Sequence, residues 1–438
     1  MNFAALSEVI FKVGRGRPHL TLSFIRALPL WLIYALRKPG LKETLHRASH
    51  ISFYREEFAK AGIDVNRIAS PEEMGTFFLT REIVKSRPEL ILSGTPALAI
   101  ESSGTSGHVS RVYLGRDEMN YYARQGGLLY ALYDLKPEDR LLCTFDLSFG
   151  LGALLVQNWV RFMPLFAMVV GRVDPKEAYS RLADYQFNII VSDPFWLARL
   201  TEIAREQGKP APIKLMIGGG EGISDRTRSE IEEFWGAPLY MTYASAEAAT
   251  TLGFECPVRR GYHVNEFDFF VEIDRPDPEG YGELVITTIT RRVMPLIRYR
   301  TGDVARWLEG RCDCGLPFRR ISPICGRVDE QVSCAWGNIY PDFFDKILGP
   351  VSGLADDWQV AVCERSGKQT FEFRLEVQNG ISHQEIKDRI FNLIKSEHPS
   401  AWQTYVQKLA GVEFNFIPLG SLRTGQKLLR LVDERQNS

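Results

Sequence analysis

The sequence lacks an apolar run long enough to cross a bilayer. Its longest apolar stretch, residues 20–36, is interrupted by Arg26 and Pro29, whereas a membrane-spanning helix needs about 20 consecutive apolar residues. We therefore expect no transmembrane segment, and because no small-residue cleavage site follows the stretch, we expect no signal peptide. Arg37 and Lys38 directly after it leave open a helix that touches lipid or a partner, with packing on the chain's own domain as the simpler interpretation.

The sequence also lacks an excess of either charge and an even set of cysteines. A net charge of −1 gives no reason to expect nucleic acid as a partner. Seven unevenly spaced cysteines do not suit a secreted disulfide framework, so we expect a cytoplasmic protein. What is present is 438 residues, 45% of them apolar and 24% charged, the composition of a globular protein of two or three domains.

Strands and helices alternate in the middle of the sequence. We expect buried strands at residues 140–145, 188–192 and 213–217, with helices at 117–133 and 224–235. This alternation predicts an α/β fold, with a large multi-layer region of mostly parallel sheet flanked by helices.

The two ends of the sequence differ from this middle part. Helical spacing of apolar residues from Leu41 to about Arg87, with Ser70 as an N-cap before Pro71, predicts a helical N-terminal segment. Near the other end, two strands at 370–376 and 411–417 and the helix between them predict a small α+β domain.

A loop rich in hydroxyl groups and glycine lies between expected strands at 96–99 and 111–114. Its glycines leave backbone N–H groups free to point at phosphate oxygens, and its hydroxyls add donors. An ordinary hairpin turn explains the same composition, so both interpretations stay open on this stretch alone. It is not a Walker A loop, because His108 stands where a lysine is needed and a strand follows. The loop consists of Ser102, Ser103, Gly104, Thr105, Ser106 and Gly107.

Two further segments follow expected strands. Glycines 218–220 and Glu221 come directly after the third strand, where a flat ring can approach the backbone of an α/β sheet. Glu247 follows a strand at 238–243, where a carboxylate suits a magnesium ion held against phosphates. A capping glutamate at a helix start explains Glu247 equally well without this context.

Two more segments lie downstream of a strand at 282–288. Asp303 ends the segment 294–303, and an aspartate in that position can accept both hydroxyls of a ribose. Arg327, in the segment 326–330, can clamp a phosphate or a ribose with its fork of donors.

Together these segments resemble the adenylate-forming ligases (the acyl/aryl-CoA synthetase superfamily), and within them the phenylacetate-CoA ligase-like branch. Residues 50–55 also resemble the short N-terminal segment of that branch, and the resemblance extends from about residue 41 to the C-terminus. The segments that carry it are 102–107, 219–221, 243–247, 294–303, 326–329 and 421–427.

The resemblance implies a role for each matching residue. The loop at 102–107 would hold the β- and γ-phosphates of ATP. Asp303 would hold the ribose, Arg327 would contact the nucleotide and Glu247 would bind Mg²⁺. Lys427 resembles the mobile catalytic lysine of the family's C-terminal domain. The surroundings of the adenine would be Gly219, Gly220, Glu221, Tyr243 and Ala244.

The resemblance also implies a division into three parts. We expect an N-terminal helical segment at 1–90 packed on a large ATP- and acyl-binding domain at 91–328, followed by a small mobile C-terminal lid domain at 329–438. Asp329 would be the hinge about which that domain rotates between adenylation and thioester formation.

This chemistry explains the residue types. A carboxylate would attack the α-phosphate of ATP, expelling pyrophosphate and leaving a mixed anhydride, and positive charge must stand where negative charge develops. We expect Lys427→Ala to lose on the order of 10²–10³ in adenylate formation. A near-native rate of pyrophosphate exchange in that variant would refute the role.

Three residues depart from the family's motifs. Ala246 stands where the family usually has Thr or Ser, Ala244 stands at a usual glycine and His108 at a usual lysine or arginine. A hydroxyl contact is then missing or taken by Ser245. We still expect ATP binding, and a degenerate nucleotide-binding regulator without turnover stays open.

Four residues offer a set of metal ligands. Cys312 and Cys314 form a Cys-x-Cys turn, and Cys256 and His263 lie about fifty residues upstream. Three sulfurs and one nitrogen suit tetrahedral zinc in a structural site, while reduced buried thiols are the alternative. Some members of the resembled branch carry a structural metal here, which favours zinc.

The carboxylic acid substrate and the acyl acceptor are the least defined parts of the predicted reaction. Phe145 and Phe149 can stack on an aromatic acid, with Gly150 leaving room and Ser245 at the opposite wall; core packing explains any one of these aromatics as well. The resemblance implies a small-molecule aromatic acid as substrate and coenzyme A as acceptor. An amine, a hydroxyl or a carrier-protein thiol stays open as the acceptor, as does a homodimer.

Overall fold

A computed structural model describes residues 17–101, 110–147, 151–365, 368–378, 380–423 and 428–435. The chain forms two compact units. The first comprises the residues up to Gly222 together with Glu230–Thr301 and Ala305–Pro323, and the second comprises Ile223–Ser229, Gly302–Val304 and the residues from Ile324 onward.

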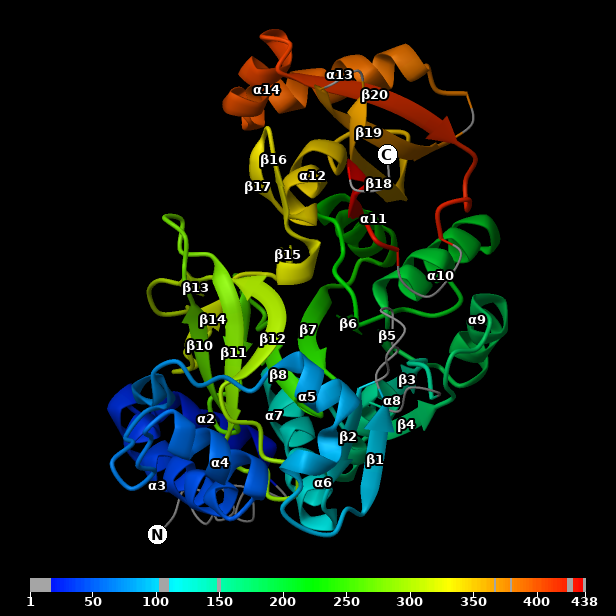
Figure 1. Cartoon of the computed structure of the whole chain (residues 1–438). Coiled ribbons are helices and arrows are strands. Elements are labelled where there is room, and N and C mark those ends of the chain that lie inside the picture. Colours follow the sequence, from blue (N-terminus) through cyan, green and yellow to red (C-terminus); the bar gives the residue numbers. More distant parts are fainter. Residues whose placement is uncertain are drawn as a thin grey trace. The chain divides into compact units, whose positions relative to one another are not determined.

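The first unit begins with helices and continues with alternating strands and helices (Figure 1). Its elements up to the middle of the chain are α2 (Pro18–Ala27), α3 (Leu30–Ser49), α4 (Ser52–Lys60), η1 (Pro71–Met74), α5 (Arg81–Ser86), η2 (Pro88–Ile91), β1 (Leu98–Glu101), β2 (Arg111–Leu114), α6 (Arg116–Tyr122), α7 (Gln125–Leu132), β3 (Arg140–Cys143), α8 (Leu151–Trp159), η3 (Val160–Phe162), β4 (Phe166–Val169), α9 (Pro175–Asp184), β5 (Ile189–Ser192), α10 (Pro194–Gln207) and β6 (Leu215–Gly219). They are followed by α11 (Asp225–Trp235), β7 (Leu239–Ser245), β8 (Thr250–Phe254), β9 (Tyr262–Val264), β10 (Phe269–Asp274), β11 (Gly282–Thr288), β12 (Tyr299–Ala305), β13 (Trp307–Leu308) and β14 (Arg320–Ile321).

A nine-stranded sheet forms the centre of the first unit, with the strand order β13-β14-β9-β8-β7-β6-β5-β3-β4. The strands from β4 to β7 run parallel, and β8, β9, β14 and β13 continue the sheet antiparallel. Parallel strands covered by helices are apolar along their whole length, and all four residues of β5 and all five of β6 are buried. Because β3, β5, β6 and β7 are parallel, their carboxyl ends lie at one edge.

Helices α7 and α8 cover one face of this sheet. Their side chains form a core cluster with alternate residues of β3, β5 and β6, and with Leu22 and Ile25 of α2. On the chain between β5 and β6, Asp193 starts α10 by accepting a hydrogen bond from the backbone N–H of Trp196 at 2.9 Å, and Pro194 occupies the first helical position. The helix that follows β5 is thus capped at its start.

The second unit contains its own sheet and core. Its elements are β15 (Gly326–Arg327), η4 (Val328–Glu330), β16 (Val332–Cys334), β17 (Gly337–Ile339), α12 (Pro341–Leu348), β18 (Leu354–Arg365), β19 (Lys368–Val377), α13 (His383–Glu397), α14 (Pro399–Val406), β20 (Ala410–Ile417) and β21 (Leu431–Asp433). The sheet has the order β20-β19-β18-β21. Phe344, Phe373 and Ile390 are fully buried between this sheet and helices α12 and α13, so this unit has the α+β architecture that the sequence predicts.

The mixed architecture confirms the predicted α/β fold class. The division at residues 90 and 328 and the hinge at Asp329 stay predictions. Among the described residues no single helix has the length and apolar character of a bilayer span, although α2 and α3, bent by 102° relative to each other, pass that test as a pair on length and composition alone.

Two local predictions were wrong. The helix expected at 117–133 is interrupted between α6 and α7, and the region 41–87 is helical only in part. Ser70 does take the predicted N-cap position before Pro71, at the start of the short helix η1, but its side chain makes no capping hydrogen bond. Glu73 accepts a hydrogen bond from the backbone N–H of Ala69 at 2.8 Å, so a carboxylate fixes the backbone at this helix start.

Candidate active site and metal centre

Two strand ends lie side by side at the carboxyl edge of the large sheet. Gly219 ends β6, and a Cβ atom placed on it would lie 2.5 Å from Oγ1 of Thr242 on β7. The Thr242 hydroxyl donates to the carbonyl of Gly218 at 2.9 Å. Only glycine allows this close approach of the two strands, and Gly220 continues with φ +89°, a conformation that also favours glycine. Glu221 follows, half-buried.

The carboxylate of Glu247 lies in the turn after β7 and is held by the residues around it. The Ser110 hydroxyl, fully buried, donates to Oε1 of Glu247 at 2.8 Å. Arg291, 1% exposed, donates from Nη1 to the backbone carbonyl of Glu247 at 2.6 Å and from Nη2 to that of Ala248 at 2.7 Å. The side chain and the backbone of Glu247 are therefore fixed by two different residues from two distant segments.

The turn itself is tightly wound. The backbone N–H of Ala248 donates to Oγ of Ser245 at 3.1 Å, and that of Ala249 donates to the carbonyl of Ser245 at 3.1 Å. Ala249 has φ +56°, which costs a non-glycine residue about 1 kcal/mol or more. The β7–β8 register also shifts between Tyr243 and Ala244, as β-bulges commonly do next to functional sites. Ser245 thus acts in the turn, where its hydroxyl accepts a hydrogen bond.

Phe145 lies near the same edge. A Cβ on Gly152, in the first turn of α8, would lie 2.8 Å from Cγ of Phe145, and a Cβ on Gly219 would lie 3.6 Å from its Cζ. The ring therefore occupies the space between the start of α8 and the end of β6. The other aromatic candidate at the same edge, Tyr243, has its ring 6.3 Å from that of Tyr262.

The second unit holds the ribose and hinge candidates. Asp303 lies in the part of β12 that belongs to this unit and pairs in register with Arg327 on β15, and Nη1 of Arg327 lies 2.6 Å from Oδ1 of Asp303. Nε of Arg327 lies 3.2 Å from Oδ1 of Asp329, and its backbone N–H donates to Glu330 at 3.2 Å. Burial raises the pKa of Glu330, which Arg327 opposes. Arg327 thus joins the ribose and hinge candidates in one small network.

Several candidates lie outside the described residues. They are Ser102, Ser103, Gly104, Thr105, Ser106, Gly107, Phe149, Gly150 and Lys427.

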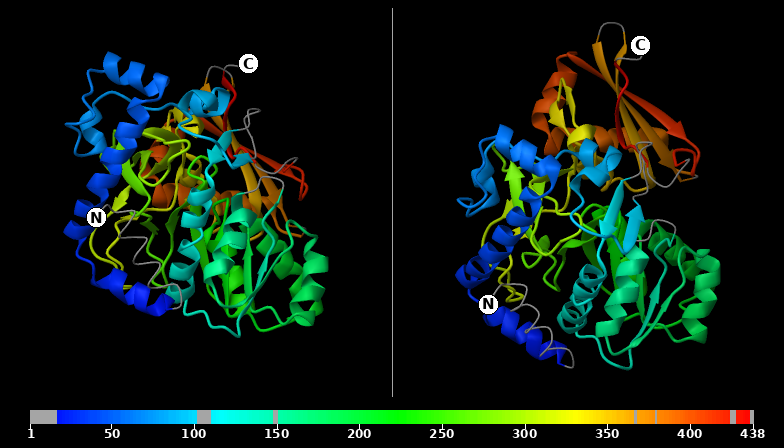
Figure 2. Two further views of the ribbon diagram at one scale, coloured as in Figure 1. Left: turned by 90° about the horizontal axis from the view of Figure 1, so that it is seen from below. Right: turned by 60° about the horizontal axis from the view of Figure 1, so that its bottom comes forward.

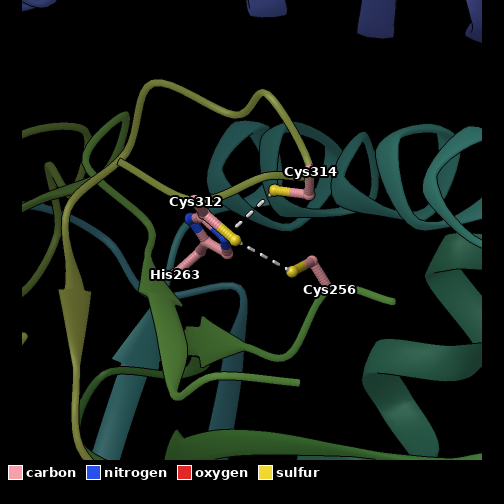
Figure 3. Close-up of side chains that lie close together, drawn as sticks. All are labelled: Cys256, His263, Cys312 and Cys314. Atoms are coloured by element: carbon pink, nitrogen blue, oxygen red, sulfur yellow. Dashed lines mark hydrogen bonds between the residues drawn. The ribbon is translucent and has the colours of Figure 1, made fainter. Parts of the chain in front are cut away.

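The four metal-ligand candidates come together (Figure 3). One side-chain donor atom from each of Cys256, His263, Cys312 and Cys314 lies within 4.8 Å of all the others. His263 is on β9, whose register places it opposite Phe254 of β8 and Arg320 of β14. Cys256 follows the end of β8, and Cys312 and Cys314 lie in the segment between β13 and β14, so the strand pairing brings together segments about fifty residues apart.

The spacing and the contacts of this cluster fit a tetrahedral metal. Sγ of Cys256 lies 3.6 Å from Sγ of Cys312, and Sγ of Cys314 lies 3.3 Å from Nε2 of His263. Nδ1 of His263 lies 3.1 Å from the carbonyl of Phe318, which orients the ring and leaves Nε2 for a ligand bond. The backbone N–H of Leu316 donates to Sγ of Cys314 at 3.4 Å.

The electrostatics of the cluster favour a bound cation. Hydrogen bonds from Cys314 and then from His263 lower the pKa of Cys256 to about 3. The pKa of Cys314 is raised, first by its hydrogen bond to Cys256. The thiolate of Cys256 therefore opposes ionisation of Cys314, and a divalent cation bound between them would supply the charge that lets both ionise.

Two residues that hold the Glu247 turn from other segments were not expected from the sequence. Ser110 follows the hydroxyl-rich loop and could have been included as one more hydroxyl of that segment. Arg291 has no motif around it, and only its burial and its fork of hydrogen bonds identify it. An arginine in a segment between two strands gives no signal of this kind in a sequence.

No protein-family model matches the chain. Among curated proteins, the phenylacetate-coenzyme A ligase of Thermus thermophilus is 25% identical over 370 residues, covering 81% of this chain and 83% of that protein. The phenylacetate-coenzyme A ligase of Pseudomonas putida is 22% identical over 377 residues, with 82% and 85% covered.

Solved structures agree with these relatives. A 2-hydroxyisobutyryl-CoA ligase in the postadenylation state superposes with a TM-score of 0.78 at 19% identity, covering 94% of this chain and 91% of that one. The o-succinylbenzoate coenzyme A synthetase of Bacillus subtilis, in complex with AMP, gives a TM-score of 0.57 at 17% identity, with 77% and 68% covered. The predicted resemblance to adenylate-forming ligases of the phenylacetate-CoA ligase-like branch is therefore confirmed.

Proposed function

Because the curated relatives of this chain are phenylacetate-CoA ligases and its fold is that of adenylate-forming ligases, we propose that it is an AMP-forming acid–thiol ligase. It activates a carboxylic acid with ATP through an acyl-adenylate and then transfers the acyl group to coenzyme A. The observation that carries the proposal within the structure is the Glu247 turn, in which Ser110 holds the carboxylate and Arg291 holds the backbone.

We assign the first half-reaction to the carboxyl edge of the large sheet. Glu247 would hold Mg²⁺, since carboxylate oxygens are the ligands that this ion prefers, and an ion bound there would supply positive charge against the phosphate oxygens. The glycines at 218–220 expose backbone on which a flat ring can lie. We place the adenine beside them, bordered by Glu221 and Tyr243.

The ribose and the catalytic lysine are assigned from the motifs. Asp303 is 8% exposed and its carboxylate is fixed by Arg327, which suits an acceptor of ribose hydroxyls because the pair is organised before the nucleotide binds. The proposal gives Lys427 the role of stabilising the charge that develops on the α-phosphate during attack of the acid.

For the acid we propose an aryl carboxylate. Phe145 offers a ring at the carboxyl edge of the sheet, between the start of α8 and the end of β6, and an aromatic substrate gains by packing on such a surface. The solved 2-hydroxyisobutyryl-CoA ligase shows why aliphatic acids belong in any test of this choice.

We further propose that Cys256, His263, Cys312 and Cys314 bind a structural Zn²⁺. Four protein donors leave no open position for a substrate, so the site would support the fold and take no part in the reaction. All seven cysteines belong to the described part of the chain and none of them forms a disulfide, which agrees with work in the reducing cytoplasm.

ATP–pyrophosphate exchange with a panel of aromatic and aliphatic carboxylic acids tests the first half-reaction without any acceptor. We expect exchange with one class of acid, followed by thioester formation when coenzyme A is added. Pyrophosphate exchange without thioester formation, together with a product formed from an amine or a carrier protein, would show that this molecule is the acyl acceptor and coenzyme A is not. ATP binding with no exchange for any acid would count against an enzyme of this kind.

A further inference from the structure

A second surface, remote in sequence from the site motifs, lies on helices α2 and α3. Three large apolar side chains there are exposed to solvent: Leu20 at 59%, Phe24 at 47% and Trp31 at 68%. Both views of Figure 2 show the two helices, in dark blue, along the outside of the first unit. Large exposed apolar side chains on adjoining helices are a feature of surfaces that contact a partner or a membrane.

The inner faces of both helices are fixed on the first unit, so the outer faces are well defined. In α2, Leu22 and Ile25 are buried in the core with α7, whereas Leu20 and Phe24, four residues apart, lie together on the opposite face. In α3, Gly40 packs against Ile289, where an added Cβ would lie 2.2 Å from a side-chain carbon, and the hydroxyl of Thr44 donates to the carbonyl of Ile289 at 3.1 Å.

The exposed face of α3 changes from apolar to basic along its length. Trp31, Ala35, Lys38 and Lys42 are exposed and follow one another at spacings of three and four residues, so they form one stripe on the helix. The tryptophan lies next to the bend with α2, and the two lysines lie on the later turns. The exposed stripe of α3 thus offers an apolar ring at one end and two long side chains with charged tips on the following turns.

The charge of this region is of one sign. Residues 17–42 contain five Lys and Arg residues and no Asp or Glu. Arg37 is turned inward and lies 3.3 Å from Glu266, while Arg17, Arg26, Lys38 and Lys42 are exposed. A two-fold dimer through this surface would oppose like charges, whereas the headgroups of an anionic bilayer would complement them.

The bend between α2 and α3 limits how the two helices can contact a membrane. The 102° angle between α2 and α3 and the burial of their inner faces keep either helix from inserting across a bilayer without leaving its core. Two helices that meet at such an angle can both lie in one plane. The geometry therefore fits contact with the membrane surface.

We propose that the α2–α3 surface, made of Leu20, Phe24, Trp31, Lys38 and Lys42, docks on the surface of an anionic lipid bilayer. The apolar side chains enter the headgroup region and the lysines contact phosphates. Because each basic residue near an anionic membrane contributes about 1 kcal/mol, removing both lysines is expected to weaken partitioning by about 30-fold. The proposal stands apart from the ligase activity, since it uses none of the residues assigned to the reaction.

Co-sedimentation of the full chain with vesicles tests the proposal, using phosphatidylcholine vesicles with and without phosphatidylglycerol. We expect binding to the mixed vesicles that falls as salt rises. The triple variant Leu20→Ser/Phe24→Ser/Trp31→Ser should lose this binding. The double variant Lys38→Ala/Lys42→Ala should bind the mixed vesicles about 30-fold more weakly and leave any binding to phosphatidylcholine alone unchanged.

The matched control is Val406→Ser/Leu409→Ser, which removes two comparably exposed apolar side chains, at 53% and 62%, from the second unit. This control should bind vesicles like the unaltered chain, and thermal unfolding should show that all variants remain folded. No binding of the unaltered chain to mixed vesicles would overturn the proposal. So would a lipid-independent dimer, seen by sedimentation velocity, that the triple variant dissociates, because it would assign the surface to a second copy.

Discussion

The two ends of strand β8 carry two different kinds of polar centre. At its start lies the turn with Glu247, a single carboxylate that is oriented by a serine hydroxyl and an arginine fork. Beyond its end lies Cys256, which joins two further sulfurs and one imidazole nitrogen within 4.8 Å. One strand of five residues therefore separates a centre with one candidate ligand from a centre with four.

On the assignments proposed above, the two ends of β8 divide stability from chemistry. Four donors would satisfy a tetrahedral ion completely, so the Cys256 end would hold segments together and take no part in the reaction. A lone carboxylate would leave most positions around a hard cation for water and phosphate oxygens, so the Glu247 end could exchange its ligands during turnover.

Removing the thiols of the Cys-x-Cys turn should have the largest effect. The double variant Cys312→Ser/Cys314→Ser should lose bound zinc and lower the free energy of unfolding by several kcal/mol, since structural zinc binding contributes about 10–16 kcal/mol in small zinc domains. Metal analysis by mass spectrometry and thermal unfolding measure the two effects. Cys334→Ser/Cys363→Ser, two thiols outside the cluster, is the control and should keep its zinc.

Substitution of the carboxylate at the other end should abolish catalysis while leaving the fold intact. Glu247→Gln keeps the size of the side chain and an acceptor for Ser110 but removes the negative charge, so the rate of pyrophosphate exchange should fall on the order of 10²–10³. The control is Glu255→Gln beyond the far end of β8. Its carboxylate accepts a hydrogen bond from the backbone N–H of Met241 at 2.8 Å, so this variant should lose stability and keep its exchange rate. Equal loss of exchange in both variants would contradict the division.

Arg291 acts on the backbone of the Glu247 turn, and its replacement should have a smaller effect. Arg291→Lys keeps the charge but cannot hold two carbonyls with one fork, so the turn should shift and exchange should fall by up to about 10². Arg292→Lys is the matched control, because the side chain of this neighbouring arginine is 55% exposed and its Nη2 lies 3.8 Å from the carboxylate of Glu43. A normal rate in Arg291→Lys, with normal stability, would show that the fork is dispensable.

Ser110 orients only one oxygen of Glu247 and should give the smallest effect. Ser110→Ala removes a hydrogen-bond donor to a carboxylate, and outer contacts of this kind change metal affinity by about tenfold. We expect the Mg²⁺ concentration for half-maximal exchange to rise by about that factor, with the rate restored at saturating Mg²⁺. A lower maximal rate that Mg²⁺ does not restore would assign the hydroxyl to the reaction itself.

Much of the carboxyl edge could be predicted from the sequence, because its residues follow strands directly. β6 and β7 end at Gly219 and Ser245. A predicted strand followed directly by glycines or a polar residue was therefore enough to place both segments at the carboxyl edge of the sheet. The four metal-ligand candidates could also be named, since a pair of closely spaced cysteines with a further cysteine and a histidine is typical of zinc ligands. Their assembly depends on β9 lying between β8 and β14, a pairing of short strands that no local pattern specifies.

Other features depend on tertiary contacts and could not be predicted. The helix expected at 117–133 has no proline at its break, but α7 carries Gly126, where a Cβ would lie 2.5 Å from the carbonyl oxygen of Trp159. The close packing of these segments positions α7 independently of α6. Arg291 is a second case, because its role comes from the carbonyls that the folded turn presents to it.

The cysteine cluster also has a consequence for the order of folding. Cys256 and Cys312 are 56 residues apart in sequence, and closing so long a loop costs entropy that only completed strand pairs repay. On the proposed assignment the four ligands meet once β9 has paired with both of its neighbours, so the metal would bind after the antiparallel part of the sheet has formed. Refolding in a chelator should therefore still form both parts of the sheet but end in a less stable protein, whose stability rises when zinc is added afterwards.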